Sequence, residues 1–375
     1  MPKTYDTVII GSGIAGCCSA YALQQKGQNV LVLDRSAVAA SGGSGAAGAF
    51  VSPKIGKGSA LQTLTNEAFE YAKSFYLQYF PKDFYQTGVI RIPKDADDAV
   101  KFPLYEAFNN TTYRKITQQA LTKLGINNSD ESFMFDEAGV CDAPQMCRAI
   151  LEKVPFMQID VERLAWDGEY WQIESSLTDS LTIRAKNIVL STGYQNELFD
   201  MRYMAVKGTW GSRGDYVSSL DLSVSMHKSI SVSANIEGIV KLGATHVKSK
   251  EPCKVCNGQP LSSLFEKASE MVDTSDFVLK ETFCGMRSGS KDYFPLVGKV
   301  IDVPFMLENY PKILRGAKPE IEHIPNLYIC NGLGGRGFVF APLMAEQLSK
   351  LIVEQQEIDK RINPDRLFLK WCRKL

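Results

Sequence analysis

The chain has 375 residues, of which 45% are hydrophobic and 22% charged, values typical of a soluble globular protein of two or three domains. This composition excludes a disordered, collagen-like or coiled-coil chain. The 42 basic and 42 acidic side chains give a formal net charge of zero, which excludes an overall basic surface for capturing nucleic acid. Only a local basic patch would serve that purpose.

Cysteine usage and the N-terminal pattern indicate the compartment. Nine cysteines, an odd number without a repeating framework, are typical of a reducing environment. The first residues lack the apolar stretch and cleavage site of a secretory signal, and no apolar run has the length of a membrane span. We therefore expect a soluble cytoplasmic protein without membrane contacts.

In chain order, the first elements form a βαβ unit. A β-branched strand over 7–10 precedes the run Gly11-Ser12-Gly13-Ile14-Ala15-Gly16, which opens a helix that Gly27 ends. A second strand over 29–33 follows, with Asp34 at its end. A glycine run between strand and helix, followed by an acidic residue after the next strand, is the fingerprint of a dinucleotide site.

Each residue of this fingerprint has a physical role. Gly11 permits the tight turn, Gly13 lets the backbone approach a pyrophosphate, and Gly16 lets helix and strand pack closely. The helix N-terminus presents free N–H groups to phosphate, and the Asp34 carboxylate accepts hydrogen bonds from ribose hydroxyls. No second fingerprint of this kind follows, so reduction by a nicotinamide within the chain is not expected.

The later pattern predicts a second domain inserted into the nucleotide-binding one. After a loop rich in small residues, the expected elements are a helix over 64–80, strands over 85–92 and 187–190, a helix over 144–154, an antiparallel region over 204–249, a strand over 327–330 and a helix over 340–355. We assign 1–84, 136–203 and 283–375 to a discontinuous nucleotide-binding domain, and 85–135 and 204–282 to a substrate-binding domain.

The pair Cys253 and Cys256 has the spacing of half a zinc site. A zinc ribbon needs a second pair or clustered histidines, and His227, His246 and His323 are scattered. The pattern favours a loop with incidental thiols, and we predict no metal.

Three segments beyond the fingerprint carry a family resemblance. They are the strand-to-Thr192-Gly193 segment over 187–193, the segment over 285–298 that contains Arg287, and the glycine-rich loop over 331–338 ahead of a helix. Together they resemble the D-amino-acid, glycine and sarcosine oxidase family of flavoproteins (DAO family).

Four shorter motifs narrow the resemblance. They are the loop that begins at Ala40-Ser41-Gly42, the triplet Gly243-Ala244-Thr245, the glycine-rich turn over 332–337, and Asn363-Pro364-Asp365-Arg366 near the C-terminus. With these, the chain is similar to the FAD-dependent oxidase half of the bifunctional bacterial enzymes that modify the tRNA wobble uridine (MnmC type). Those enzymes carry a methyltransferase half before the oxidase, whereas this chain starts at the flavin fingerprint. We expect methylation to be absent or supplied by a separate methyltransferase.

The resemblance implies the fold and the cofactor. The fold class is α/β, with a glutathione-reductase-like FAD-binding Rossmann domain and an inserted mixed or antiparallel α+β substrate domain. The implied FAD-binding residues are Gly11, Ser12, Gly13, Ile14, Ala15, Gly16, Asp34, Arg35, Ser41, Gly42, Val161, Thr192, Gly193, Gly334, Gly335, Arg336, Gly337 and Phe338.

The resemblance also implies the chemistry. Hydride moves from the carbon beside an amine nitrogen to the flavin, and O2 is the expected electron acceptor. Carboxymethylaminomethyl-uridine would give an imine that water splits into glyoxylate and aminomethyl-uridine. Arg287 takes the place of the family's carboxylate-binding arginine. The alternative for Arg287 is a structural ion pair with Asp292.

Three functions remain open on the sequence alone. The first is oxidation of modified tRNA, for which the C-terminal segment over 360–374, with its basic residues and with Phe368 and Trp371, is a candidate RNA patch. Lys54 and Lys57 are candidates at the site entrance. The second function is oxidation of a free glycine, sarcosine or D-amino acid, which the neutral charge favours. The third is flavin binding without turnover.

Overall fold

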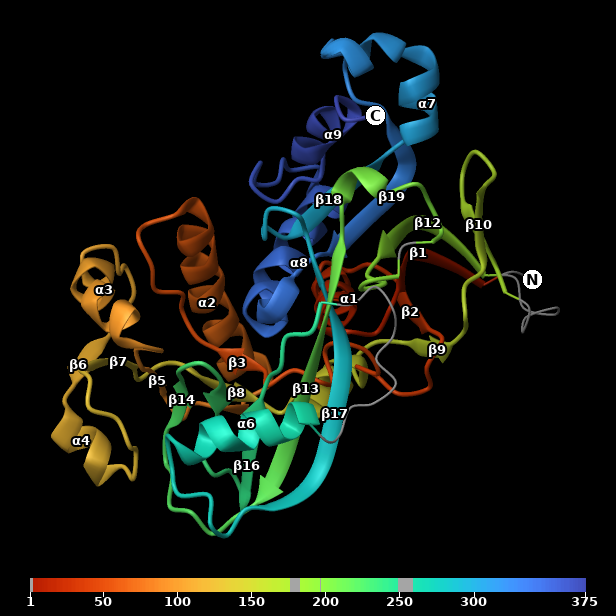
Figure 1. Cartoon of the computed structure of the whole chain (residues 1–375). Helices are drawn as coiled ribbons and strands as arrows, with labels where there is room; N and C mark the ends of the chain where they lie inside the picture. Colours follow the sequence, from red (N-terminus) through yellow and green to blue (C-terminus); the bar gives the residue numbers. More distant parts are fainter. Residues whose placement is uncertain (1–2, 176–182, 196, 249–258) are drawn as a thin grey trace.

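The computed structural model describes residues 3–175, 183–195, 197–248 and 259–375, in which strands form two large sheets and one small sheet (Figure 1). No helix in these ranges is both long and apolar enough to cross a membrane. Cys253 and Cys256 lie outside the described residues.

The first large sheet contains the predicted βαβ unit. Its strands are β1 (Lys3–Ile10), β2 (Val30–Asp34), β9 (Phe156–Gln158), β10 (Arg163–Trp166), β11 (Trp171–Glu174), β12 (Ile183–Leu190), β18 (Leu296–Ile301) and β19 (His323–Asn331). The order is β10-β11-β12-β1-β2-β9, and β19 also pairs with β12. Strands β9, β2, β1, β12 and β19 are parallel, so their carboxyl ends meet at one edge.

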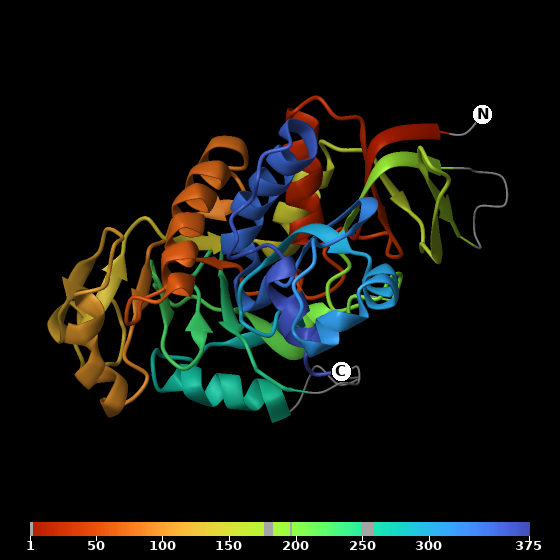
Figure 2. The same cartoon turned by 90° about the horizontal axis from the view of Figure 1, so that it is seen from above.

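Alternation along these strands explains how both faces of the sheet are covered. Ile9, Val32 and Val189 face a layer of helices, whereas Val8 and Leu31 face the opposite core. The helical layer consists of α1 (Ile14–Gln25), α2 (Ala60–Tyr79), α5 (Ala143–Leu151) and α8 (Gly337–Glu354). The opposite face packs with β10 and β11 and with η1 (Arg202–Met204), α7 (Val303–Asn309), η2 (Pro311–Arg315) and α9 (Asp365–Cys372). Helices α1 and α8, from opposite ends of the chain, lie side by side (Figure 2).

The second large sheet is mixed. Its order is β17 (Val278–Gly289), β13 (Lys207–Val217), β16 (Ile239–Gly243), β15 (Ser231–Val232), β14 (Ser225–His227), β5 (Val89–Arg91), β7 (Ser132–Phe135) and β6 (Arg114–Ile116). Neighbours are antiparallel except for β14 and β5. The other elements in this part of the chain are α3 (Ala96–Glu106), α4 (Gln118–Lys123) and α6 (Gln259–Ser269).

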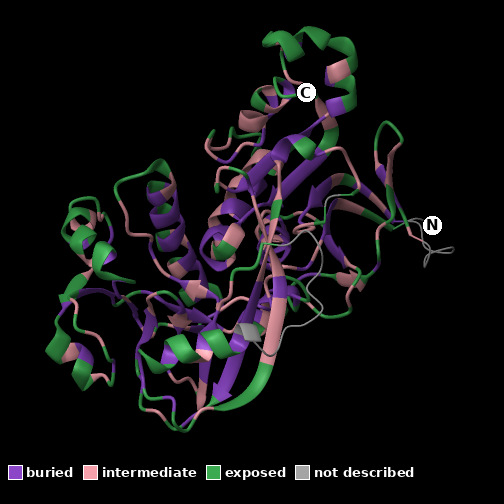
Figure 3. Cartoon of the chain, in the orientation of Figure 1, coloured by how far each residue is buried: buried purple, intermediate pink, exposed green. Residues whose placement is uncertain are grey.

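The small sheet consists of β3 (Phe50–Val51), β8 (Gly139–Cys141) and β4 (Phe84–Tyr85), and the short turn η3 (Gly334–Arg336) precedes α8. Buried residues concentrate in the strands of the large sheets, while α3, α4 and α7 are largely exposed (Figure 3). The predicted α/β fold with a Rossmann unit and a mixed second sheet is confirmed. The domain boundaries stay a prediction; β17 runs without a break through residue 283, where one of them was set.

Candidate active site

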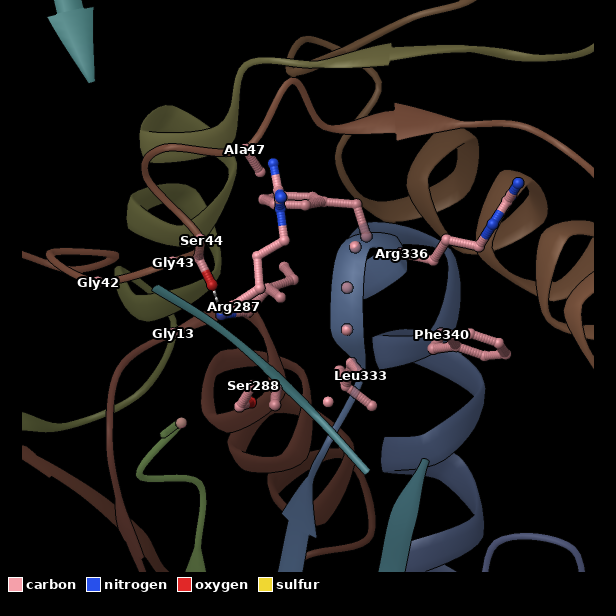
Figure 4. Close-up of a pocket in the computed structure, with 18 of the residues that line it drawn as sticks. Gly13, Gly42, Gly43, Ser44, Ala47, Arg287, Ser288, Leu333, Arg336 and Phe340 are labelled. Carbon is pink, nitrogen blue, oxygen red and sulfur yellow. Dashed lines mark hydrogen bonds between the residues drawn. The ribbon is translucent and has the colours of Figure 1, made fainter. Parts of the chain in front are cut away.

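A cavity of about 1370 Å³ lies where the carboxyl edge of the first sheet meets the second sheet. Its wall combines the turn between β1 and α1, the small-residue loop after β2, the end of β17 and the segment that leads into α8 (Figure 4). Pockets for drug-sized ligands usually measure roughly 300–1,000 Å³. The cavity therefore has room for a larger ligand.

The fingerprint turn is built on close backbone contacts. Gly11 has φ +110°, and a Cβ there would lie 2.4 Å from the carbonyl oxygen of Ser191. A Cβ on Gly16 would lie 1.9 Å from the carbonyl oxygen of Gly11. A Cβ on Gly13 would meet only Ser44 Oγ, at 3.1 Å. The first and third glycines are thus required by packing within the protein, and the second keeps the backbone open toward the cavity at the N-terminus of α1.

Asp34 is fixed at the end of β2. Its Oδ2 accepts hydrogen bonds from the backbone N–H and the hydroxyl of Ser12, each at 2.7 Å, and its Oδ1 accepts one from the Ser36 N–H at 2.9 Å. These three donors fix the orientation of the carboxylate. Because Asp34 also lines the cavity, its carboxylate stands where a ribose would lie if the pyrophosphate were at the helix terminus.

Most of the predicted cofactor residues share one cavity wall. The residues that line it are Gly11, Gly13, Ile14, Ala15, Asp34, Arg35, Ser41, Gly42, Val161, Thr192, Gly193, Gly334, Gly335, Arg336, Gly337 and Phe338. Ser12 and Gly16 do not line the cavity; they lie behind the turn and shape it. The free N–H groups at the N-terminus of α1, the open Gly13 backbone and the Asp34 carboxylate fit a dinucleotide such as FAD.

Arg287 enters the cavity from β17, where it pairs with Thr209 of β13. Its Nη1 donates a hydrogen bond to the carbonyl oxygen of Thr245 at 3.1 Å. A Cβ on Gly211 would lie 2.2 Å from Nη2, so only glycine leaves room for the guanidinium. Burial lowers the pKa of Arg287. Within the described ranges, no carboxylate lies within ion-pair distance of this side chain.

The alternative role for Arg287, an ion pair with Asp292, is wrong. The Asp292 carboxylate instead accepts two hydrogen bonds from Arg366 of α9, at 2.9 and 3.0 Å. A partly buried guanidinium that faces a cavity and has one carbonyl partner among the described residues is suited to bind an anionic group.

The small-residue loop after β2 is fastened beside Arg287. A Cβ on Gly43 would lie 2.4 Å from the carbonyl oxygen of Met286, and Ser44 Oγ accepts a hydrogen bond from the N–H of Ile14 at 3.0 Å. The loop therefore touches both β17 and the start of α1, and its small residues are needed for this close packing.

The residue that holds this loop was missed in the sequence. Arg213, only 1% exposed, donates from Nη1 to the carbonyl oxygens of Gly45 and Ala47, and its Nε donates to Asp215 at 2.8 Å. Residues two apart on a strand point to the same side. The Arg-Gly-Asp spacing over 213–215 was the signal that identifies such a pair.

A cationic wall forms another part of the cavity lining. It is formed by Lys54, Arg91 and Arg336, all of which line the cavity. The Arg336 Nη1 donates to the carbonyl oxygen of Ser52 at 3.1 Å, and the side chain is directed away from Arg287 (Figure 4). Burial and the neighbouring Arg91 lower the pKa of Arg336 to about 10. Arg91 was not predicted; it pairs with Asp98 at 3.1 Å.

The structure corrects the candidate RNA patch at the C-terminus. Phe368 is fully buried against Tyr203 and Trp371, so it has no face left for a nucleobase. Arg361 forms ion pairs with Asp359 and Glu67, and Arg366 forms an ion pair with Asp292. The aromatic residues belong to the inner, apolar face of α9, which packs on the core below the first sheet. Lys360, Lys370, Arg373 and Lys374 remain exposed.

The fold and the site together define a dinucleotide-dependent flavoprotein of the oxidoreductase class. The chain belongs to the FAD dependent oxidoreductase (DAO) family, which matches residues 6–351. The recognition made from the sequence motifs is thereby confirmed, and with it the FAD cofactor and the enzyme class.

Relatives support this membership at two levels. The chain is 25% identical over 97% of its length to the tRNA 5-methylaminomethyl-2-thiouridine biosynthesis bifunctional protein MnmC of Stutzerimonas stutzeri, and 26% identical over 98% of its length to the protein of that name from Vibrio vulnificus. It spans 59% of the length of each. The glycine oxidase of Bacillus cereus shares its fold with a TM-score of 0.77 at 17% identity, and the match covers 94% of this chain and 96% of the oxidase. The glycine oxidase of Geobacillus kaustophilus gives a TM-score of 0.79 at 15% identity, with 95% of this chain and 96% of the oxidase covered.

Proposed function

We propose that the protein oxidises the carboxymethylaminomethyl group of a tRNA wobble uridine, giving aminomethyl-uridine and glyoxylate. The observation that carries this proposal is the Arg287 guanidinium, which lines the cavity, has no carboxylate partner among the described residues and fits the carboxylate of the substrate's N-linked acetate. Similarity to the MnmC proteins over nearly the whole chain supports the RNA-borne substrate. We place the protein in the cytoplasm, where tRNA is modified.

The cofactor would be held by the wall described above. The N-terminus of α1 and the Gly13 backbone would bind the pyrophosphate, and Asp34 would bind the ribose. The backbone N–H groups over 334–338, at the start of α8, would face the flavin ring and stabilise negative charge on it. When bound, FAD accepts the hydride that leaves the methylene carbon beside the amine nitrogen.

The residues of this chain supply position more than acid–base chemistry. The Arg287 guanidinium is positioned by its hydrogen bond to the Thr245 carbonyl oxygen and by the absence of a side chain at Gly211. It would hold the substrate carboxylate so that the methylene group faces the flavin. Loss of hydride and of the nitrogen proton gives a C=N bond. Water adds to its carbon, and the C–N bond then breaks to release glyoxylate and the primary amine.

A second candidate substrate is a free amino acid such as glycine, sarcosine or a D-amino acid. The same Arg287 would bind its carboxylate, and the net charge of zero gives no overall attraction for RNA. For either substrate we propose O2 as the acceptor that reoxidises the flavin, which would produce hydrogen peroxide, and a separate methyltransferase for any later methylation of the tRNA product.

One anaerobic experiment separates the two substrates. The yellow holoprotein is mixed with tRNA carrying carboxymethylaminomethyl-uridine, with the same tRNA lacking the group, and with glycine, sarcosine or D-alanine, while flavin absorbance is followed. We expect bleaching by the modified tRNA and not by the unmodified control. Bleaching by the free amino acids alone would overturn the proposal in favour of the second candidate.

A further inference from the structure

The cavity mouth carries an exposed aromatic ring that the chemistry of the site does not use. Tyr293, in the turn between β17 and β18, lines the cavity and yet is 77% exposed. Its φ of +68° is rare for a residue with a side chain. A large apolar ring held in this conformation at the entrance of a site calls for a binding partner.

The turn that presents Tyr293 is fixed from both sides. Ser290 Oγ donates hydrogen bonds of 2.9 and 2.6 Å to Asp292 Oδ1 and to the carbonyl oxygen of Phe294. Arg366 of α9 donates to the same two residues. The ring is thus displayed from a rigid frame, which lowers the entropy lost when a ligand stacks on it.

Exposed basic side chains lie in the same turn and in the C-terminal segment that ends near it. Lys291 is exposed in the turn, and the nearby Lys374 ammonium lowers the pKa of Lys291. Lys370 and Arg373 are exposed on the same C-terminal segment. Within the described part of the chain, none of these four side chains has a carboxylate within ion-pair distance, in contrast to Arg361 and Arg366 of the same segment.

Two neighbouring ammonium groups, one of them carried by the turn that also exposes an aromatic ring, match the chemistry of a nucleotide, with phosphate at the cations and a base on the ring. We infer that Tyr293, Lys291 and Lys374 form a docking rim for single-stranded RNA next to the substrate nucleotide. Tyr293 stacks on a base that flanks the oxidised uridine, and the two lysines contact the phosphates. This inference rests on the proposed function, because a free amino acid would reach Arg287 without touching the rim.

The test measures RNA affinity of the holoprotein by fluorescence anisotropy, with an anticodon stem-loop that lacks the modification. Tyr293→Ala is expected to raise the Kd about tenfold, since stacking of a base on an aromatic ring accounts for roughly this factor or more. Tyr293→Phe keeps the ring and is expected to bind within about twofold of the unchanged protein. The ring is exposed, so neither variant disturbs the core.

Charge reversal tests the lysines separately. In the Lys291→Glu/Lys374→Glu variant the slope of log affinity against log salt should fall by roughly one or more, because about two phosphate contacts are lost. Lys123→Glu, an exposed lysine of α4, makes the same type of charge change elsewhere and is expected to leave affinity and slope unchanged.

The possible results separate this inference from the proposed function. If modified tRNA bleaches the flavin but the rim variants bind RNA as the unchanged protein does, the docking rim is wrong and the function stands. An equal loss of affinity in Lys123→Glu also overturns the rim, because it shows non-specific attraction. If the rim variants lose RNA affinity while only free amino acids bleach the flavin, the proposed reaction fails and the RNA-binding rim stands.

Discussion

Two arginines on neighbouring strands of the second sheet have opposite surroundings. Arg213 on β13 is followed two residues later by Asp215, which binds its guanidinium, whereas Arg287 on β17 is followed at the same distance by Gly289. The first is buried, paired with a carboxylate and holds the small-residue loop. The second faces the cavity, and no carboxylate of the part of the chain that the structure describes pairs with it. The comparison indicates that the supply of a partner acid, and not burial alone, distinguishes the structural arginine from the one that we propose to bind the substrate.

The largest expected effect concerns the structural pair. Arg213→Met leaves the Asp215 carboxylate buried without its partner and releases the carbonyl oxygens of the loop, so the free energy of unfolding should fall by about 3–5 kcal/mol. Urea denaturation of the apoprotein measures this loss. The Arg213→Met/Asp215→Leu variant removes both charges and should recover part of it. An Arg213→Met protein as stable as the unchanged one would refute the structural role.

The ligand-binding arginine should show the reverse behaviour. Arg287→Lys keeps the positive charge but loses the planar fork, so kcat/KM should fall by about 100-fold, or roughly 2.7 kcal/mol in the transition state. The free energy of unfolding should change by less than about 0.5 kcal/mol, because no partner acid is left unpaired. Steady-state kinetics on the modified tRNA and urea denaturation check the two parts. A nearly unchanged kcat/KM would show that Arg287 does not bind the substrate carboxylate.

His227 extends the comparison to a half-buried base in the cavity lining that stays neutral. Burial, together with the nearby Arg91 and Arg336, lowers the pKa of His227 to about 3. The unfolded chain takes up a proton near pH 6.5 while the folded protein does not, so stability falls as the pH drops from 6.5 toward 3. Between pH 7 and 5 the unchanged protein should lose about 1–2 kcal/mol more than His227→Gln.

The control for His227 is its hydrogen-bond partner. Ser231→Ala removes the contact between Ser231 Oγ and His227 Nδ1, which measures 2.8 Å, but keeps the titrating ring. This variant should retain the acid sensitivity of the unchanged protein. Equal pH dependence in His227→Gln and the unchanged protein would show that another group titrates.

The smallest expected effect tests how Arg287 is positioned. Gly211→Ala places a methyl group where Arg287 Nη2 now lies, so the guanidinium must shift and kcat/KM should fall about tenfold. In an Arg287→Lys background the same substitution should cost much less, because the fork is already lost. Equal losses in the two backgrounds would show that Gly211 acts independently of the arginine.

Local chemistry made the nucleotide-binding half predictable. The strand, glycine run, helix and second strand follow from contacts within 34 residues. The structure gives α1 and β2 within about a residue of the expected bounds, whereas β1 begins at Lys3, four residues before the predicted start. The segment around Arg287 was found because its motif is compact. Residue type and spacing were sufficient for the βαβ unit, whereas the role of Arg287 came from the family resemblance and stays a prediction.

The remaining features depend on contacts between distant segments. Asp292 seemed a natural partner for Arg287, but Arg366, 74 residues away, binds it. The sequence suggests an exposed, stacking role for Phe368, but in the structure its ring packs against Tyr203. The cationic wall of Lys54, Arg91 and Arg336 joins three separate parts of the chain. No local pattern reports such pairings.

The central claim is that Arg287 holds an N-linked acetate whose methylene group loses hydride to the bound flavin. Its most direct test is a single anaerobic turnover of the holoprotein with tRNA bearing carboxymethylaminomethyl-uridine, with glyoxylate and the nucleosides of the digested tRNA quantified by mass spectrometry. We predict one glyoxylate and one aminomethyl-uridine for each flavin reduced, and neither product with Arg287→Met. Reduced flavin with an intact wobble nucleoside would contradict the account.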